Sequence, residues 1–360
     1  MLTAADHEFM EQALELAGRG LYTTTPNPRV GCVIVKDGVL VGSGWHEKAG
    51  LPHAEVLALK EAGDRARGAA LYVNLEPCSH HGRTPPCVDA IVASGIKRVV
   101  AAMQDPNPKV AGSGFAKLRT AGITVEHGLK EDEARELNIG FVSRMARGRP
   151  WMRMKIAASL DGRTALANGR SRWITGEAAR ADGHRWRARA CAVLTGFGTV
   201  RDDDPQLNVR GVDTPRQPLK IVVDSKFETS PSARLLSEGK TLVVGAVNDA
   251  KRIASLKAAG AEVAIIPNDS GKVELHKLME ELARRELNEI HAEAGTKLNG
   301  SLLQAGVVDE LLVYLAPSVI GDSGRGMFSL PELIELSQAT ALEIREVERI
   351  GPDVRILARI

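Results

Sequence analysis

The sequence predicts an α/β protein of two domains, and three observations support this class. At 360 residues, the chain is longer than one ordinary single-core domain. Its first half alternates strand-like and helix-like patterns in the order β-β-α-β-α-β. Its second half repeats apolar strands followed by helical stretches, which is typical of a largely parallel sheet covered by helices. We therefore place the domains at residues 1–148 and 149–360.

The composition indicates a soluble globular protein rather than a disordered or membrane-bound one. Hydrophobic residues make up 44% of the chain, and its 47 basic and 45 acidic residues are interleaved, so no polycationic surface for nucleic acid stands out. The acidic N-terminus excludes a secretory signal, and no run approaches the roughly 18 apolar residues of a membrane span. Four cysteines are too few for a disulfide framework, and Cys32 and Cys191 lie in apolar runs as expected buried thiols. We expect a cytoplasmic protein.

The first half begins with a helix and a hairpin. Residues 6–19 carry apolar side chains at helical spacing. Two prolines in residues 25–31 restrict the backbone around Asn27. This side chain either presents its amide to a base-like ring or stabilises its own turn, and the segment alone favours the turn. Residues 30–35 and 39–45 are β-rich and flank Lys36-Asp37-Gly38, a strong hairpin signal. Further strands are expected at residues 70–75, 96–101 and 123–126, with helices opening at His53 and after Cys87, and another helix before the last strand.

His53, Glu55, Cys78 and Cys87 supply an imidazole, a carboxylate and two thiolates. His53 and Glu55 would project from the first turn of one helix, and Cys87 would lead into another. Imidazole and thiolate are preferred zinc ligands, and three protein ligands leave one position for water. A chance histidine beside two buried thiols is the alternative, but the joint spacing of these residues favours a metal site.

This arrangement resembles the cytidine and deoxycytidylate deaminase superfamily. The resemblance implies that Glu55 is not a ligand but the proton shuttle. Zinc would lower the pKa of a bound water toward neutrality, and the carboxylate would pass its proton to the ring nitrogen and the departing amine. Glu55 could instead complement the dipole of its helix, but the neighbouring histidine and the cysteines favour the shuttle.

The spacing of the two cysteines departs from the usual superfamily pattern. Eight residues separate Cys78 from Cys87, where the usual motif has two, and the insertion holds His80 and His81, which could compete as ligands. This longer insertion, with residues 25–31 and 104–108, is similar to the deaminase half of the bifunctional riboflavin biosynthesis family. The resemblance implies zinc on His53, Cys78 and Cys87, with Asn27, His46 and Arg83 near the substrate.

The second half follows a basic segment, residues 144–150, that contains glycine and proline and lacks apolar periodicity, so we interpret it as the linker. Polar and glycine-rich clusters then follow four apolar strands, at residues 159–163, 195–205, 223–225 and 293–296. Open α/β sheets bind ligands at the carboxyl ends of their strands, so these clusters predict a site. Gly196-Phe197-Gly198-Thr199 is only half of a Gly-x-Gly-x-x-Gly motif, which disfavours a standard Rossmann site. Strands are expected at residues 151–157, 192–195, 219–223, 241–245, 262–266, 289–292 and 310–315.

In order and spacing these clusters resemble the reductase half of the same family, which has a dihydrofolate-reductase-like fold and uses NADPH. A helix starting after residues 295–300 would present free amides to a cofactor phosphate. The alternatives are solvated surface charge for Arg187 and Arg210, and core packing for Trp173 and Leu207. The resemblance implies cofactor contacts at Ala157, Trp173, Thr199, Asp203, Ser225, Gly295, Thr296, Lys297, Leu298, Asn299, Gly300 and Ser301, and substrate contacts at Ser171, Arg187, Leu207, Arg210 and Glu293.

The resemblance covers essentially the whole chain and implies two consecutive reactions. Zinc-activated water would deaminate 2,5-diamino-6-(5-phosphoribosylamino)pyrimidin-4(3H)-one, and NADPH would then reduce the ribosyl group of 5-amino-6-(5-phosphoribosylamino)uracil to ribityl. A nucleic-acid-editing deaminase with an unrelated appended domain is one alternative, disfavoured by 4% aromatic residues and a net charge of +2. A binding protein with structural zinc is another, and it would need four protein ligands. We expect small phosphorylated pyrimidines as partners, no nucleic acid or membrane, and a homo-oligomer.

Overall fold

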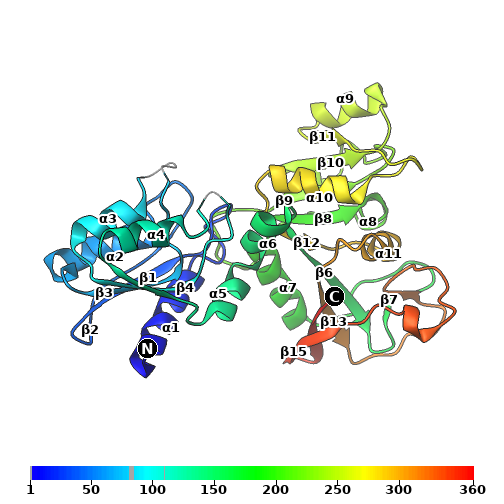
Figure 1. Ribbon diagram of the computed structural model, residues 1–360. Helices are drawn as coiled ribbons and strands as arrows, with labels where there is room; N and C mark the ends of the chain where they lie inside the picture. The colour runs from blue at the N-terminus through cyan, green and yellow to red at the C-terminus, as the bar shows by residue number, and fades with distance from the viewer. Residues whose placement is uncertain (1, 81–84, 109) are drawn as a thin grey trace. The chain divides into compact units, whose positions relative to one another are not determined.

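The computed structural model describes residues 2–80, 85–108 and 110–360 (Figure 1). The chain divides into two compact units, Met1–Gly148 and Arg149–Ile360. In the described part of the chain, no helix combines the length and apolar character needed to cross a membrane.

The first unit is a three-layer α/β sandwich. Its elements are α1 (Ala4–Gly18), β1 (Gly31–Lys36), β2 (Val39–Trp45), α2 (Ala54–Ala62), β3 (Ala70–Leu75), α3 (Cys87–Ser94), β4 (Arg98–Met103), α4 (Ser113–Thr120), β5 (Thr124–His127), α5 (Glu131–Leu137) and α6 (Ile139–Arg147). The strands form one sheet in the order β2-β1-β3-β4-β5, antiparallel at the hairpin and parallel from β3 to β5.

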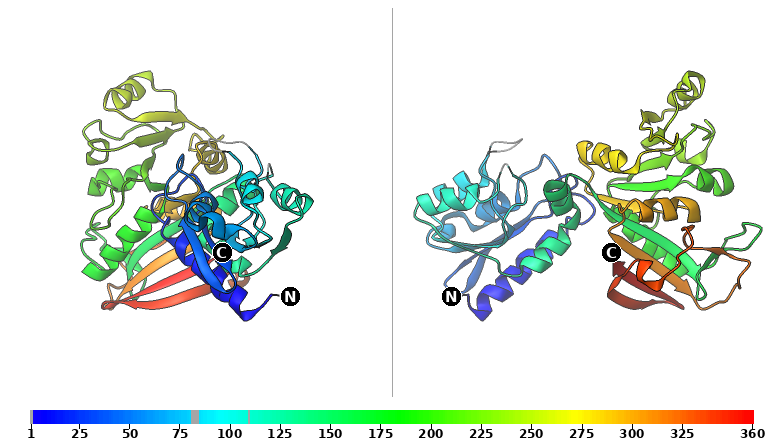
Figure 2. Two further views of the ribbon diagram at one scale, coloured as in Figure 1. Left: turned by 90° about the vertical axis from the view of Figure 1, so that its left-hand side faces the viewer. Right: turned by 45° about the vertical axis from the view of Figure 1, so that its right-hand side comes forward.

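Alternation along the strands directs apolar side chains to both faces of this sheet. Ile34 and Leu71 pack with α2, α3 and α4 on one face, whereas Val33 and Val100 pack with α1, α5 and α6 on the other. Helices thus cover both faces of this sheet (Figure 2). The predicted hairpin is confirmed: β1 and β2 pair antiparallel around Asp37 and Gly38, whose φ angles are 49° and 77°. Such left-handed conformations are what a tight two-residue hairpin turn requires.

The predicted linker, residues 144–150, contains the boundary between the two units, but its first four residues are helical rather than irregular. Residues 144–147 are the last turn of α6, which ends at Gly148 with a φ of 67°. Of the apolar residues of this helix that pack against the sheet, Phe141 and Val142 lie upstream of the segment, and only Met145 lies within it. A sequence segment that begins at Arg144 contains only the last turn of the helix, so the helical spacing of its apolar residues cannot be recognised there.

The second unit is built on a larger, mostly parallel sheet. Its main elements are β6 (Trp151–Ser159), β7 (Arg163–Ala165), α7 (Glu177–Arg189), β8 (Ala192–Gly196), α8 (Phe197–Asp203), β9 (Leu219–Val223), β10 (Thr241–Gly245), α9 (Ala250–Ala258), β11 (Glu262–Ile265), α10 (Leu275–Arg284), β12 (Glu289–Ala292), α11 (Thr296–Gln304), β13 (Glu310–Ala316), β14 (Arg325–Gly326), β15 (Glu343–Ile350) and β16 (Asp353–Arg359). The large sheet has the order β11-β10-β9-β8-β12-β6-β13-β16-β15. Its strands are parallel up to β13, as predicted, and β16 and β15 add an antiparallel edge.

Helices cover both faces of this sheet. Leu278 of α10 and Leu302 of α11 pack with Met154 and Leu194 on one face. On the opposite face, α8 and α9 pack against Val222 and Val243, and α7 packs against Leu312 and Tyr314. The carboxyl ends of the parallel strands are thus left to the loops, where a ligand can approach.

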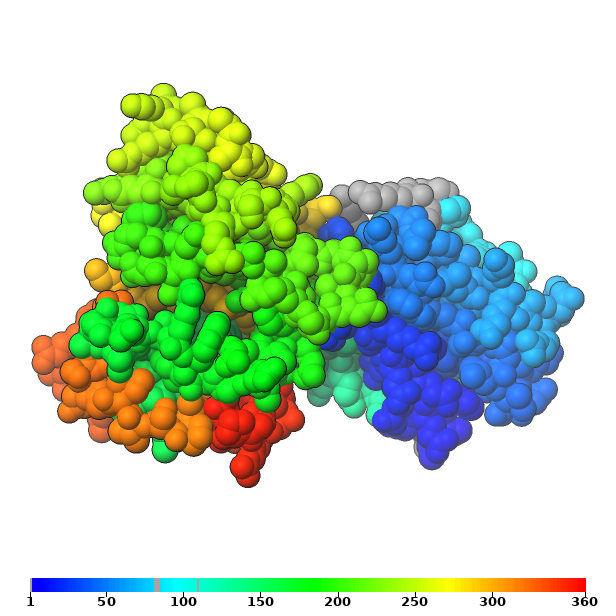
Figure 3. Space-filling view, turned by 180° about the vertical axis from the view of Figure 1, so that it is seen from behind, coloured from blue at the N-terminus to red at the C-terminus, as the bar shows by residue number. Residues whose placement is uncertain are grey.

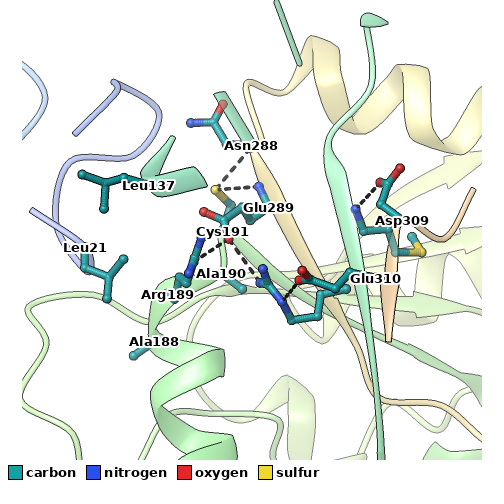
Figure 4. A network of polar contacts seen from close by, with 12 residues as sticks. Leu21, Leu137, Ala188, Arg189, Ala190, Cys191, Asn288, Glu289, Asp309 and Glu310 are labelled. Atoms are coloured by element: carbon teal, nitrogen blue, oxygen red, sulfur yellow. Dashed lines mark hydrogen bonds and ion pairs between the residues drawn. The ribbon is translucent and has the colours of Figure 1, made fainter. Parts of the chain in front are cut away.

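A buried charged network holds the opposite, amino-terminal end of the sheet. The guanidinium of Arg153, only 1% exposed, lies 3.2 Å from Glu289 Oε2 and 2.5 Å from Glu310 Oε2. Arg189 donates from Nε to Glu289 at 2.8 Å (Figure 4). Removing one partner of such a buried pair leaves an uncompensated charge, at a cost of about 3–5 kcal/mol. These contacts therefore stabilise the amino-terminal end of the sheet, whereas the polar clusters predicted from the sequence lie at its carboxyl-terminal end.

Candidate functional site

A cluster of metal-binding side chains lies where α2 and α3 begin. His53 is the N-cap of α2, Cys87 is the first residue of α3, and Cys78 lies in the connection after β3. Their ligand atoms all lie within 4.8 Å of one another. His53 Nδ1 is 3.1 Å from Cys87 Sγ and 3.6 Å from Cys78 Sγ. The structure thus brings the three predicted ligands together; the exposed His80 is not part of the cluster.

The chemistry of this donor set fits zinc. A hydrogen bond from the Cys87 thiol lowers the pKa of Cys78 to about 4, so Cys78 is a thiolate. The same hydrogen bond and burial raise the pKa of Cys87. A divalent cation between the two sulfurs and the imidazole would replace the shared proton, and one imidazole with two thiolates is a ligand set of zinc deaminases.

Glu55 lies beside this cluster and also fits a metal with bound water. Its side chain is 3% exposed, and burial raises its pKa. Glu55 Oε2 is buried without a hydrogen-bond partner among the described residues. Buried polar atoms are almost always paired, so this oxygen indicates a missing donor such as a water molecule. The carboxylate is not one of the three clustered ligands.

Asn27 and His46 form a polar pair next to the cluster. Asn27 Nδ2 lies 3.0 Å from His46 Nε2, and His46 Nδ1 lies 3.1 Å from the carbonyl oxygen of Pro52. Because a carbonyl only accepts, Nδ1 carries the proton and Nε2 accepts from the Asn27 amide. Burial lowers the pKa of His46, which favours this neutral form. The His46 ring meets the His53 ring edge-on at 5.3 Å, so His46 adjoins a ligand directly and Asn27 is linked to it through His46. Arg83 lies outside the described residues.

Glu76 is a residue of this site that sequence reasoning missed. Its buried carboxylate accepts four backbone N–H groups, two from the connection between β4 and α4, at Asp105 (3.1 Å) and Gly112 (2.9 Å), and two from the first turn of α4, at Gly114 (2.9 Å) and Phe115 (3.3 Å). It stands two residues before Cys78. The segment that carries this thiolate is therefore fastened to the loop in front of α4, a contact that no local pattern could reveal.

In the second unit, the four predicted clusters meet at one edge of the sheet. They follow β9, β8, β12 and β6, which are consecutive neighbours in the strand order, and all four strands are parallel. The helix expected after Gly300 begins earlier, at Thr296, with Gly295 as its N-cap. Asn299 and Gly300 pack inward: Asn299 Nδ2 donates to the Met327 carbonyl at 3.2 Å, and a side chain on Gly300 would collide with the Ser329 carbonyl. Only the first residues of this segment can therefore face a phosphate.

A charged cluster occupies the end of β12. Arg187 Nη2 donates to Glu293 Oε2 at 2.9 Å, and Arg187 Nε pairs with Glu293 Oε1. Lys155 Nζ lies 3.9 Å from Glu293 Oε2, and His291 Nε2 lies 3.3 Å from Glu293 Oε1. Burial lowers the pKa of Lys155, although Glu293 opposes this effect. Lys155 and His291 were not predicted; a lysine inside an apolar strand pattern was the available signal for Lys155.

The other predicted reductase residues have varied surroundings. Leu207 is 3% exposed, so its side chain belongs to the core, and only its backbone could meet a ligand. Arg210 donates its backbone N–H to His184 Nδ1 at 3.2 Å. Trp173 is 70% exposed, with the Arg180 guanidinium 4.7 Å from its ring centroid. Thr199 Oγ1 lies near Gly295, and Asp203 accepts from Arg172 through its carbonyl. Ala157 lies in β6, Ser171 in the connection between β7 and α7, and Ser225 in the connection after β9.

Comparison with known proteins agrees with this arrangement. Residues 3–103 match the family described as the cytidine and deoxycytidylate deaminase zinc-binding region, and residues 150–356 match the RibD C-terminal domain. The chain is thus an enzyme that joins a zinc-binding deaminase domain to a reductase domain. It is 48% identical to the riboflavin biosynthesis protein RibD of Escherichia coli K12, over 97% of this chain and 98% of that protein.

Solved structures give the same result. RibD of Acinetobacter baumannii (form 2) superposes with a TM-score of 0.91 at 43% identity, covering 99% of this chain and 98% of that one. A diaminohydroxyphosphoribosylaminopyrimidine deaminase/5-amino-6-(5-phosphoribosylamino)uracil reductase of Thermotoga maritima gives 0.88 at 34% identity, covering 98% of each chain. The chain belongs to the RibD family, the bifunctional deaminases and reductases of riboflavin biosynthesis.

Proposed function

We propose that the first unit deaminates 2,5-diamino-6-(5-phosphoribosylamino)pyrimidin-4(3H)-one and that the second reduces the resulting 5-amino-6-(5-phosphoribosylamino)uracil with NADPH. The observation that carries the proposal is the pairing of a His53, Cys78 and Cys87 cluster with the unpartnered buried oxygen of Glu55. The similarity to the deaminase and reductase of Thermotoga maritima, which is named after these two substrates, supports the proposal.

In the deaminase site, His53, Cys78 and Cys87 would hold one zinc ion. Zinc bound there supplies a water molecule of lowered pKa. Glu55 takes the proton of the attacking water and delivers it to the ring nitrogen, and it then carries a second proton to the amine. The C–O bond forms, the C–N bond breaks, and ammonia leaves. Burial raises the pKa of Glu55, and a higher pKa makes the carboxylate a better proton acceptor for its role as shuttle.

Asn27 and His46 would orient the pyrimidine in this site. The His46 tautomer is fixed by Pro52, so the Asn27 amide is held in one orientation beside the ligand cluster. Arg83 is proposed as a further contact to the ring or to the phosphate of the substrate.

In the reductase site, the charged cluster at the end of β12 would receive the sugar. NADPH bound at this edge supplies hydride to C1′ of the ribosylamine. Lys155 would donate a proton to the ring oxygen as the C1′–O4′ bond breaks, and Glu293 keeps this lysine in place at 3.9 Å. Because Arg187 is paired with Glu293, Arg210 is the better candidate for the substrate phosphate.

The remaining cofactor contacts would lie along the same edge, with Ser171 and Leu207 toward the substrate. They are proposed at Ala157, Trp173, Thr199, Asp203, Ser225 and along the segment from Gly295 to Ser301, of which only the first residues would face a phosphate because Asn299 and Gly300 pack inward.

We further propose a cytoplasmic homo-oligomer that acts on small molecules rather than on nucleic acid. The support for assembly is an exposed apolar surface in the second unit. Leu333, Ile334 and Leu336 are 49%, 87% and 95% exposed, on a segment of the surface drawn in orange in Figure 3. Apolar groups gathered in this way are typical of surfaces that a partner covers.

The test is to incubate the purified chain with the diaminopyrimidine phosphate, with and without NADPH, while ammonia and NADPH are followed together. Ammonia release without NADPH, and NADPH oxidation only after deamination, are expected. Absence of ammonia release from a zinc-loaded chain would overturn the deaminase proposal. Absence of NADPH oxidation with the uracil compound would overturn the reductase proposal.

A further inference from the structure

An open cavity of about 430 Å³ lies in the second unit, between the start of α8 and the loop that follows β9. Its wall combines Phe197 and Phe227 with the hydroxyls of Thr229 and Ser230 and the charged side chains of Glu228 and Arg252. The volume is in the range of small-molecule sites, and the mixture of aromatic, hydroxyl and guanidinium groups suits a nucleoside phosphate.

The cavity is shaped by a constrained loop. Asp224 Oδ2 accepts from the Thr229 backbone N–H at 2.7 Å and from the Thr229 hydroxyl at 2.8 Å. The backbone of Phe227 has a left-handed conformation, with a φ of 54°. Its ring packs so closely on Gly245 that a Cβ atom at that position would lie 2.3 Å from the ring. A non-glycine residue adopts this backbone conformation at a cost. The loop therefore fixes the Phe227 ring against the end of β10 before any ligand arrives.

Arg252 supplies the positive charge of the cavity. Its Nη1 donates to the Lys226 carbonyl at 2.9 Å, which anchors the guanidinium to the loop. Two carboxylates face it more loosely, Asp249 at 3.5 Å and Glu228 at 4.0 Å, and its side chain is 46% exposed. Neither contact is a tight bidentate pair, so the guanidinium can still form charge-assisted hydrogen bonds with a phosphate.

The position of the cavity relates it to the reductase site. The strands β12, β8, β9 and β10 are consecutive in the sheet, and Glu293 follows the first of them. With strands about 4.8 Å apart, the cavity lies about 10–14 Å along the edge from the Glu293 cluster. Thr199, a proposed cofactor contact, is on α8 between the two and two residues after Phe197. An extended dinucleotide whose nicotinamide lies near Glu293 would therefore reach the cavity with its other end.

We propose that this cavity receives the adenosine end of the dinucleotide and that Arg252 binds its 2′-phosphate, so that Arg252 selects NADPH over NADH. This inference rests on the proposed reductase function. Phe197 offers a face for the purine, and Arg252 forms a charge-assisted contact that only the phosphorylated cofactor can make. Glu228 acts in the opposite sense, since a carboxylate at this place favours a free 2′-hydroxyl.

Two measurements test the proposal with three variants of the full-length chain. Calorimetry compares binding of adenosine 2′,5′-diphosphate and adenosine 5′-diphosphate, and steady-state kinetics compares kcat/KM for NADPH and NADH with the uracil substrate. Arg252→Gln removes the proposed contact, and Glu228→Gln removes the opposing charge. Lys251→Gln is the matched control, because it removes one positive charge from the same helix but does not line the cavity.

For the wild type we expect the 2′-phosphorylated probe to bind at least about tenfold tighter than the 5′-diphosphate. Arg252→Gln should abolish this difference and lower kcat/KM for NADPH by about 10- to 100-fold, with NADH unchanged. Glu228→Gln should increase the preference for NADPH, and Lys251→Gln should leave it unaltered. If Arg252→Gln and Lys251→Gln behave alike, or if the wild type does not discriminate between the probes, the assignment is overturned. A wild type that oxidises neither cofactor would refute the reductase proposal itself.

Discussion

Arg187 and Glu293 approach each other from α7 and from the end of β12, and the guanidinium meets both carboxylate oxygens. Each side chain is 16% exposed, so the pair is largely removed from water. The pairing orients Glu293 toward Lys155 and His291. This ion pair thus organises the charged cluster to which we assign the reduction.

The first prediction concerns this pair. Glu293→Gln keeps the shape of the side chain but removes the charge that holds Arg187 and Lys155. We expect kcat/KM for NADPH oxidation with the uracil compound to fall by about 10²-fold, with ammonia release unchanged. Glu281→Gln is a matched control, since Glu281 is 17% exposed and also accepts from an arginine, Arg285 at 2.8 Å. Equal effects of the two changes on reduction would contradict a role for Glu293 at the site.

The second prediction isolates the proton shuttle. Glu55→Gln cannot accept the proton of the attacking water, so ammonia release should fall by about 10²–10⁴. NADPH oxidation should disappear with the diaminopyrimidine as substrate and return to near the wild-type rate when the uracil compound is supplied. Glu61→Gln, on the same helix and bound to Ser43, should retain both activities. Unchanged ammonia release by Glu55→Gln would rule out the assignment.

A third prediction concerns the Glu76 clamp, by which we mean the hydrogen bonds that the Glu76 carboxylate accepts from backbone N–H groups. Glu76→Ala removes the acceptor of four backbone N–H groups, so the segment that carries Cys78 loses its attachment to the loop before α4 and to the first turn of this helix. We expect zinc to leave for a chelator at least about tenfold faster, because supporting contacts commonly change metal affinity by about 10–100-fold. Glu76→Gln, which keeps one carbonyl oxygen, should recover part of the loss. Identical chelation rates for both variants and the wild type would show that the clamp does not position the ligand.

Metal content gives a fourth prediction. One zinc per chain is expected, and Cys78→Ser should remove it, whereas Cys191→Ser should not. Cys191 is buried in the second unit and accepts from the backbone N–H groups of Asn288 and Glu289 at 3.2 and 3.4 Å. Chelation of the wild type should stop ammonia release but spare NADPH oxidation with the uracil compound. Zinc that persists in Cys78→Ser would place the metal elsewhere.

The fifth prediction is a pH dependence of stability. Burial and the charges of Arg187 and Arg210 lower the pKa of His184 from 6.5 to about 4. As the pH falls from about 6.5 to 4, the unfolded chain binds a proton at this residue and the folded chain does not. The free energy of unfolding therefore decreases through this window, by roughly 1–2 kcal/mol after allowance for solvent. His184→Gln should flatten the pH profile of urea unfolding between pH 4.5 and 6.5. An unchanged slope would contradict this.

Much of the fold could be predicted because its signals are local. The hairpin at Asp37-Gly38, the β3 strand and the helix starts at His53 and Cys87 depend on short motifs, and the structure has them within two residues. The ligand cluster was predictable because sequence spacing fixes side chains at neighbouring helix starts. Glu76 could not be found in this way, since its partners are distant in sequence, whereas Lys155 left one local signal, a lysine within an apolar strand pattern, that was not used. The edge strands β15 and β16 were missed because charged residues interrupt their apolar alternation.

The strand order has a consequence for how the chain is made. β6 opens the second unit, but its neighbours in the sheet are β12 and β13, and the contacts of Arg153 with Glu289 and Glu310 span 136 and 157 residues. During synthesis β6 therefore stays unpaired until nearly the whole chain has emerged, because β12 and β13 are made late. Pairing between strands so distant in sequence is also slow. The first unit, whose sheet is complete by β5, can fold on the ribosome well before then. A nascent chain stalled before β12 would carry a folded first unit and an unpaired, aggregation-prone β6.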